Sequence, residues 1–237
     1  MVFWNILHGG GPERLPLIAL ELLEQDADVI GLCEFRACRG GSLRGVLYDH
    51  GYADQVALSG PEGGNGLLLA SRVGLDRSNV GGARDGRDFA GVLSAIAGDG
   101  TRITIAHVPA KGVGAARTAR NLAWRRLLGV AREHAGDRHV IVGDLNCTRH
   151  RLDEPGATCR DPAMLGRISS LGYDDAFASR RREYSWVSHR GTAYRLDHAF
   201  CSRAVAGGLT GAEYARSPME QGLSDHALVR LEVDPGG

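Results

Sequence analysis

The sequence lacks the features of several protein classes. It has five cysteines, an odd number, and no C-x-x-C pair, which argues against a disulfide framework and a zinc knuckle. No apolar run approaches the length of a membrane span, and no charged-then-apolar leader precedes the first expected strand. No internal repeat, low-complexity tract or linker is visible. We therefore expect a globular protein, and a reducing cytoplasm is the compartment we predict.

An excess of charge of one sign is also lacking. The chain carries 28 Lys+Arg and 28 Asp+Glu, so the whole molecule is no polycation. The charge is uneven, because residues 110–200 hold 16 basic and 10 acidic residues while residues 1–109 hold 9 and 13. A basic half around a carboxylate site would suit a phosphate-bearing substrate. The alternative is ordinary variation on a solvated face.

The length and the hydrophobic pattern predict a single α/β domain over residues 1–237. Helical patterns cover 15–23, 42–50, 115–134 and 162–171. The longest, 115–134, has an expected inner face of Leu122, Leu127, Leu128 and Ala131. Strand patterns cover 2–7, 28–34, 65–71, 89–97, 102–108, 140–143, 184–187, 194–201, 211–215 and 226–233. This mixture favours two β-sheets packed face to face with helices.

Polar residues stand at the ends of several of these apolar strands. Acids, amides and a histidine occupy the positions Asn5, Glu34, Asp144, Asn146, Asp225 and His226. Each residue alone could simply cap a strand or a turn. Burying such a group, however, costs several kcal/mol unless it finds a partner. Four separate strands with such ends therefore predict one shared site, built around a metal.

The residue types indicate which chemistry such a site could perform. The oxygens of Asp144 and Asn146 can hold a hard cation and orient a water. In Ser224-Asp225-His226 the carboxylate can bind metal and the imidazole can bond a phosphoryl oxygen. This triplet cannot be a serine-hydrolase triad, because adjacent residues cannot form its geometry.

Two further polar residues lie in or after apolar strands. Asp197 needs a partner if it is buried, and the candidates are His226 or a nearby arginine. His107 stands near the end of the expected strand 102–108 and could donate a proton to a leaving oxygen. The alternative for His107 is a hydrogen-bonded histidine of the core.

Taken together, these motifs resemble the endonuclease/exonuclease/phosphatase superfamily. The order is Trp-Asn, a Glu after the second strand, His-x-Pro, Gly-Asp-x-Asn, Leu-Asp and Ser-Asp-His, and it spans residues 2–233. This superfamily includes exonuclease III-type abasic-site endonucleases and pancreatic-type deoxyribonuclease. The resemblance implies a four-layer α/β sandwich of two packed mixed β-sheets flanked by helices.

The resemblance also implies a role for each site residue. The metal, Mg²⁺ or Mn²⁺, would be held by Glu34 with Asn5 and Asp225 close by. The remaining residues would be catalytic: Asp144 orients or deprotonates the attacking water, Asn146 and His226 hold the phosphoryl oxygens, Asp197 buttresses His226, and His107 occupies the position where deoxyribonuclease-like members have histidine. A metal ion with neutral or cationic donors suits phosphodiester hydrolysis, which builds negative charge on oxygen.

Other positions bear on the substrate. Trp186, Tyr194 and Leu196 are similar to the abasic-endonuclease residues that form a pocket for an extruded sugar, although Trp186 could instead be part of the core. Arginines that could contact DNA phosphates are Arg149, Arg151, Arg160 and the run Arg180–Arg182. They could equally be solvated loop charges.

A nuclease acting on DNA is the hypothesis that these features favour. Leu7, His107 and a short 147–183 segment depart from abasic endonucleases, so a small-molecule or lipid-headgroup phosphoesterase is the alternative. A catalytically silent binding module is a third hypothesis. Silent members would be expected to lose at least one of the residues Glu34, Asp144, Asn146, Asp225 and His226, all of which are present. No feature of the sequence indicates the oligomeric state.

Overall fold

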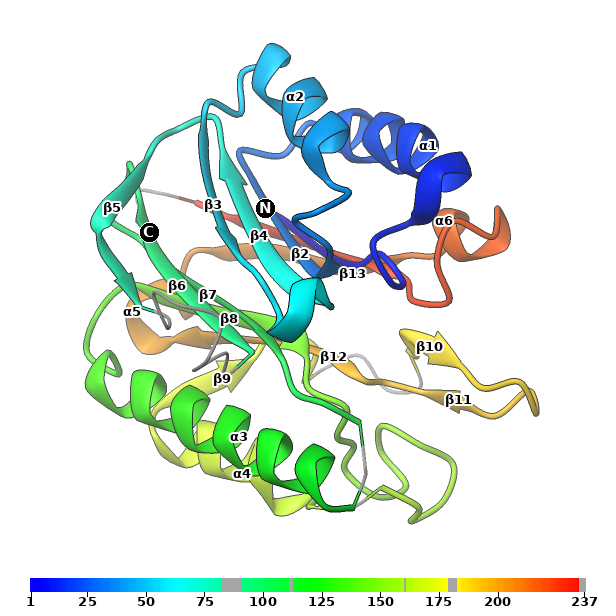
Figure 1. Cartoon of the computed structure of the whole chain (residues 1–237). Coiled ribbons are helices and arrows are strands. Elements are labelled where there is room, and N and C mark those ends of the chain that lie inside the picture. Colours follow the sequence, from blue (N-terminus) through cyan, green and yellow to red (C-terminus); the bar gives the residue numbers. More distant parts are fainter. Residues whose placement is uncertain (82–90, 111–112, 160, 179–182, 235–237) are drawn as a thin grey trace.

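Two six-stranded β-sheets pack face to face between two layers of helices (Figure 1). The computed structural model describes residues 1–81, 91–110, 113–159, 161–178 and 183–234, and statements about the fold refer to these ranges. The arrangement confirms the predicted four-layer sandwich of two mixed sheets. The extent of the single domain, residues 1–237, stays a prediction.

The first sheet contains both ends of the described chain. Its order is β13 (Leu209–Ala215), β14 (Leu228–Val233), β1 (Val2–Asn5), β2 (Val29–Phe35), β4 (Gly66–Ser71) and β3 (Asp54–Leu58). The helices α1 (Gly11–Glu24) and α2 (Gly41–Asp49) cover its outer face (Figure 1). Two one-turn elements, a 3-10 helix at Pro61–Gly63 and α6 (Ser217–Glu220), lie in its connections.

The second sheet carries the other half of the predicted site residues. Its order is β5 (Leu75–Gly81), β6 (Val92–Ala97), β7 (Arg102–His107), β8 (His139–Asp144), β12 (Asp197–Ser202) and β9 (Tyr173–Asp175). Its outer face packs against α3 (Ala115–Glu133) and α4 (Ala163–Ser170), and the short α5 (Arg203–Ala206) follows β12. A separate hairpin of β10 (Trp186–Val187) and β11 (Ala193–Tyr194) projects from the end of the sandwich (Figure 1).

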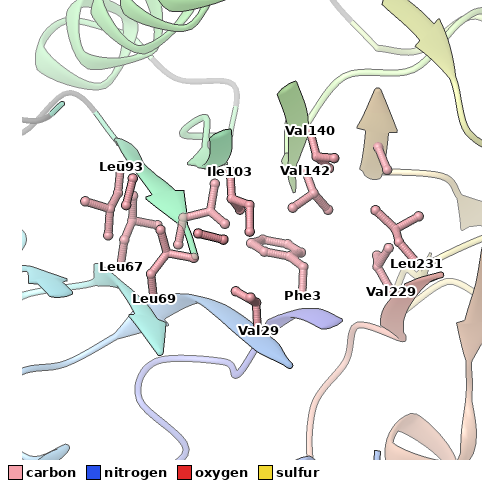
Figure 2. Close-up of a cluster of buried hydrophobic side chains, with 14 of the residues drawn as sticks. Phe3, Val29, Leu67, Leu69, Leu93, Ile103, Val140, Val142, Val229 and Leu231 are labelled. Carbon is pink, nitrogen blue, oxygen red and sulfur yellow. The ribbon is translucent and has the colours of Figure 1, made fainter. Parts of the chain in front are cut away.

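The core between the sheets follows from the two-residue alternation of strands. In β1, Phe3 faces the second sheet while Val2 and Trp4 face the helices. Val140, Val142 and the facing residues of both sheets fill the space between them (Figure 2). The sheets approach closely at Gly31, where an added Cβ would lie 2.7 Å from Ile105 Cγ2.

Several elements differ from the sequence-based expectation. The strands β3, β5 and β9 were not predicted, and β3 and β9 are short or only half-buried, so their apolar pattern is weak. The expected strand 194–201 is divided between β11 and β12. The division arises because the backbone of Arg195 and Leu196 bonds elsewhere: Arg195 N–H donates to Asp153 O, and Leu196 O accepts from Leu145 N–H.

The inner face of α3 also differs from the prediction. Trp124, Leu127 and Ala131 are buried, whereas Leu122 is 36% exposed. Positions 122 and 124 are about 200° apart on a helix, so both cannot face the sheet. The larger indole of Trp124 occupies the inner side.

Among the described residues no helix combines the length and apolar character that a membrane crossing requires.

A buried histidine at the start of β8 predicts a pH dependence of stability. His139 Nδ1 lies 2.7 Å from the Tyr173 hydroxyl and Nε2 lies 2.8 Å from Thr104 Oγ1. Burial, together with the positive charge of neighbours, lowers the pKa of His139 from 6.5 to about 3. The contribution of neutral His139 to the free energy of unfolding is therefore fully present above pH 6.5 and is lost as pH falls towards 3.

We expect the free energy of unfolding to fall faster with acid in wild type than in His139→Gln. The difference in slope should approach about 1.4 kcal/mol per pH unit below the ordinary histidine pKa. Urea unfolding from pH 7 to pH 4 measures it, and carboxylate titrations common to both proteins cancel. If the free energy of unfolding falls equally with pH in wild type and His139→Gln, the expected role of His139 is contradicted.

Candidate active site

A pocket of about 640 Å³ opens where strand ends from both sheets meet the β10–β11 hairpin. It is lined by most of the residues that the sequence predicted, namely Glu34, His107, Asp144, Asn146, Trp186, Tyr194, Leu196, Asp225 and His226. Asn5 and Asp197 lie behind this lining and are 1% and 0% exposed. The structure thus brings together eleven of the twelve predicted site residues, all except Arg149.

Strand register places three of these residues side by side. His107 of β7 pairs with Asp144 of β8, and Asp144 pairs with Asp197 of β12. Directly paired residues of neighbouring strands project from the same face of a sheet. The three side chains therefore form one row at the end of the second sheet.

Backbone distortions aim two other residues into the pocket. Glu34 has a φ of +56°, and the pairing of β2 with β4 shifts register between Cys33 and Phe35. Such a bulge turns a side chain from the direction that simple alternation would give it. Asn146, two residues after the end of β8, has a φ of +45°. Positive φ is costly for residues other than glycine and is concentrated at functional sites.

Asn5 joins the two sheets at the centre of the site. Its amide Nδ2 donates to Asp144 Oδ2 at 3.0 Å and to Glu34 Oε1 at 3.3 Å, while its Oδ1 accepts the Leu7 N–H. The sequence predicted Asn5 as a metal ligand. Its Oδ1 has a second lone pair, so the metal-ligand role stays a prediction, and its amide N–H groups donate to both carboxylates.

Asp144 is buried and surrounded by polar groups. Its Oδ1 accepts the Asn146 N–H, and its Oδ2 lies 3.8 Å from His226 Nε2 and 3.9 Å from His107 Nε2. Burial raises the pKa of Asp144 to about 6, with the histidines partly offsetting the effect and Asp197 adding to it. Such a carboxylate can exchange a proton near neutral pH.

Asp197 and His226 form a buried hydrogen-bonded pair, as the sequence predicted. His226 Nδ1 lies 2.8 Å from Asp197 Oδ2, so the ring presents Nε2 to the pocket. Burial alone would lower the pKa of His226, but Asp197 and Asp144 raise it to about 10. The two carboxylates therefore favour the protonated form of His226, whose ring lines the pocket.

Asp225 and two aromatic residues, Trp186 and Tyr194, line the same pocket. Asp225 Oδ2 accepts the Trp186 Nε1–H at 2.9 Å, and Asp225 Oδ1 is buried without a hydrogen-bond partner among the described residues. The ring of Trp186 lies 5.7 Å from that of Tyr194 and 6.3 Å from that of His226. Trp186 is half-buried and lines the pocket, so it is not simply a core residue.

Arg149 is not at the site, which corrects the prediction that it binds substrate. Its guanidinium pairs with Asp153 and Asp175, each at 2.7 Å, and it is absent from the pocket lining. Buried acids need a countercharge, and Arg149 supplies it. Arg151 is exposed on the same loop; Arg160 and Arg180–Arg182 lie outside the described residues.

Sequence reasoning missed several residues of the pocket. His8 and the loop residues Thr158 and Cys159 line it, and Asn65 Nδ2 donates to Glu34 Oε2 at 2.8 Å. Asn65 immediately precedes β4, so it carries the same signal, a polar residue at a strand end, that identified Asn5. His8 follows the first strand by three positions and could have been found in the same way.

Two groups of side chains could hold a divalent metal. One ligand atom from each of Asp144, Asp197 and His226 lies within 4.8 Å of the others. Asp197 and His226 are already bonded to each other, however. The carboxylates of Glu34 and Asp225, with the unpartnered Oδ1 of Asp225, form the second group.

The fold and the site together define a phosphoester hydrolase. The model of the Endonuclease/Exonuclease/phosphatase family matches residues 2–226. The chain belongs to this family, which confirms the resemblance found in the sequence, and enzymes of the family depend on a metal.

Solved structures share the whole fold. A 3′ phosphatase from Neisseria bound to product DNA hairpin has a TM-score of 0.82 at 20% identity, with 98% of each chain covered. An AP endonuclease from Archaeoglobus fulgidus has a TM-score of 0.82 at 18% identity, with 99% of each chain covered. A 3′-5′ exonuclease from Neisseria meningitidis has a TM-score of 0.77 at 21% identity, with 98% of each chain covered. The search of curated proteins gave no significant match.

Proposed function

We propose that the protein is a divalent-metal-dependent phosphodiesterase that acts on DNA by water attack on a phosphodiester. The observation that carries the proposal is the setting of Asp144. This buried carboxylate has a pKa of about 6 and lies 3.8 Å from the cationic ring of His226. A proton acceptor beside a fixed cation suits the transfer of a phosphoryl group to water.

The donor set fits a hard divalent cation. Glu34 and Asp225 line the pocket, and the buried Asp225 Oδ1 has no partner among the described residues. Mg²⁺ commonly takes one or two carboxylates and retains waters, and Mn²⁺ accepts the same oxygens. We expect Mg²⁺ or Mn²⁺ at these residues, where it would neutralise charge on the phosphoryl oxygens.

The protein's own groups supply the remaining chemistry. Asp144 accepts a proton from the attacking water, and Asn5 holds its carboxylate in place through the 3.0 Å hydrogen bond. His226 and Asn146 hold phosphoryl oxygens, and Asp197 fixes the orientation of the His226 ring. His107, whose Nε2 is 3.9 Å from both Glu34 and Asp144, donates a proton to the leaving oxygen.

An aromatic wall supports DNA as the substrate. Trp186, Tyr194 and Leu196 line one side of the pocket, where they could stack on a base or enclose a sugar. Structurally similar enzymes include a phosphatase bound to a DNA hairpin and an AP endonuclease. A cytoplasmic location is part of the same proposal.

One observation favours a smaller phosphoester as a second candidate. Among the described residues that line the pocket there is neither arginine nor lysine, and Arg149 is occupied by Asp153 and Asp175. A duplex-binding enzyme normally makes several contacts from basic residues to phosphates. A small-molecule phosphodiester would need fewer.

Metal removal and salt dependence test the proposal. We expect EDTA to abolish cleavage of plasmid, abasic duplex and single-stranded DNA, and Mg²⁺ or Mn²⁺ to restore it. Affinity of Asp144→Asn for a duplex should fall steeply with salt, with a log–log slope of about −0.9 per phosphate contact. Metal-independent cleavage would refute the proposal. Turnover of bis-aryl phosphodiester without measurable DNA binding at low salt would favour the second candidate.

The pKa values of Asp144 and His226 predict a bell-shaped pH profile. Asp144 must be deprotonated, so kcat/KM should rise as pH passes about 6. His226 must be protonated, so kcat/KM should fall as pH passes about 10. Because Asp197 raises the pKa of His226, Asp197→Asn should move the alkaline limb to lower pH. If the alkaline limb of Asp197→Asn lies at the same pH as in wild type, Asp197 does not raise the pKa of His226.

A further inference from the structure

A compact group of polar atoms lies at the rim of the pocket, on the side of Glu34. Glu34 Oε2 is 2.8 Å from His8 Nδ1 and 2.8 Å from Asn65 Nδ2, and these two nitrogens are 2.9 Å apart. The His8 side chain is 61% exposed, whereas that of Glu34 is 13% exposed. The imidazole thus covers the carboxylate from the solvent side.

Two placements of the imidazole proton fit this triangle. Arg36 Nε donates to Asn65 Oδ1 at 2.9 Å, which orients the amide so that its NH₂ group faces both His8 and Glu34. If His8 Nδ1 carries a proton, it donates to Glu34 Oε2 and has no lone pair for a metal. If Nδ1 carries a lone pair, it faces a carboxylate oxygen at 2.8 Å, and two acceptors repel each other.

A cation bound by both atoms would stabilise the second placement, in which His8 Nδ1 carries a lone pair. Two ligand atoms that bind an octahedral cation at right angles, each at about 2.1 Å, are separated by about 3 Å. The separation of Nδ1 and Oε2, 2.8 Å, is close to this value. Asn65 and the His8 backbone N–H, which is 2.8 Å from the same oxygen, then hold the carboxylate in place.

The backbone shows that this position of His8 is built into the fold. Five consecutive residues have positive φ: Leu7, His8, Gly9, Gly10 and Gly11. Glycine adopts this conformation freely, but for Leu7 and His8 it costs on the order of 1 kcal/mol or more each. The turn returns the chain across Glu34, and Gly9 packs against the Arg36 side chain, where an added Cβ would meet Arg36 Cβ at 3.1 Å.

We propose that His8 binds, through Nδ1, the same metal ion that Glu34 holds, and that it shifts the metal preference from Mg²⁺ towards Mn²⁺. Imidazole nitrogen suits first-row transition metals, whereas Mg²⁺ favours oxygen ligands. The inference rests on the proposed function in one respect, namely that a catalytic metal sits at Glu34. It adds a ligand and a metal selectivity to that site.

Electron paramagnetic resonance of Mn²⁺ tests the inference without measuring activity. Wild type with one equivalent of Mn²⁺ should show ¹⁴N coupling in electron spin echo modulation, and His8→Ala should lose it. Loss of a ligand should weaken Mn²⁺ binding about tenfold or more, while Mg²⁺ affinity should change less. His50→Ala removes an exposed histidine at the end of α2 and should behave as wild type.

Glu34→Gln separates the failure of this inference from that of the proposed function. If Glu34→Gln loses Mn²⁺ while His8→Ala keeps wild-type affinity and wild type shows no ¹⁴N coupling, His8 is not a ligand and the proposed function stands. If Glu34→Gln binds Mn²⁺ as wild type does, the metal is not at Glu34 and both are overturned. Nitrogen coupling that vanishes only in His8→Ala, with Mn²⁺ lost in Glu34→Gln, supports both.

Discussion

Replacing Asp144 with asparagine is expected to lower kcat/KM by about 10²–10⁴-fold, the range typical for loss of a general base. Asparagine has nearly the same shape, and its oxygen can still accept the Asn146 N–H that Asp144 Oδ1 accepts at 3.0 Å. It cannot take a proton from water. The loss should therefore appear in kcat, with a much smaller change in KM.

The stability of Asp144→Asn separates a catalytic defect from a folding defect. Because the folded-state pKa is raised from 3.8 to about 6, the stability linked to this group is present below pH 3.8 and is lost as pH rises through about 6. At pH 8 the wild type therefore carries an unfavourable buried charge that the variant lacks. We expect the Tm of Asp144→Asn, measured in EDTA at pH 8, to lie within a few degrees of the wild-type Tm.

Asp174→Asn is the matched control for this substitution. Asp174 is an exposed acid on β9, so the same chemical change there should leave both kcat/KM and Tm near wild type. Near-normal turnover of Asp144→Asn would remove Asp144 from its role. A large fall in Tm would show that the carboxylate is needed for folding instead.

The second large effect is expected from His226, and it should depend on Asp197. His226→Ala should lower kcat/KM by about 10²–10⁴-fold, because the cation beside the phosphoryl site is lost. Asp197→Asn should lower it less, since Asp197 acts through the ring that it holds at 2.8 Å. Residues that act as one unit are strongly non-additive.

A double-mutant cycle measures this dependence. The variant with both substitutions should be within about threefold of His226→Ala alone, so that Asp197→Asn has little further effect once the imidazole is absent. Tyr214→Phe is a useful neighbouring control: the Tyr214 hydroxyl donates to the backbone oxygen of Asp197, whereas His226 bonds to the Asp197 carboxylate. Additive losses from Asp197 and His226 would show that Asp197 acts independently of the ring.

Much of the site could be predicted because burial leaves a local signal in the sequence. Glu34, Asp144 and Asp225 each interrupt or end an apolar strand, and a charge in such a position needs a special environment. The same reasoning predicted the pair of Asp197 and His226, which the structure confirms at 2.8 Å. Neither inference required knowledge of how the sheets pack.

Local patterns in the sequence do not show in which direction a side chain points or which group it contacts. Asn5 and Asp144 are 139 positions apart in sequence, and only their contact shows that the Asn5 amide donates to the carboxylate. Arg149 could not be separated from a phosphate-binding arginine by sequence, because one of its two acidic partners, Asp175, lies far along the chain on β9. His8 reaches Glu34 through a turn of positive φ, and its position three residues after β1 does not show that its ring points at Glu34.

The sequence by itself determined the kind of fold, the family and most of the chemical groups in the pocket. These depend on strand-end polarity and on motif order, which are properties of neighbouring residues along the chain. The tertiary structure alone decided which group each side chain faces, since the bulge at Glu34, the row of His107, Asp144 and Asp197, and the ion pairs of Arg149 all arise from contacts between distant segments. Hydrogen bonds and charges act over a few ångströms in space, whatever the separation along the chain.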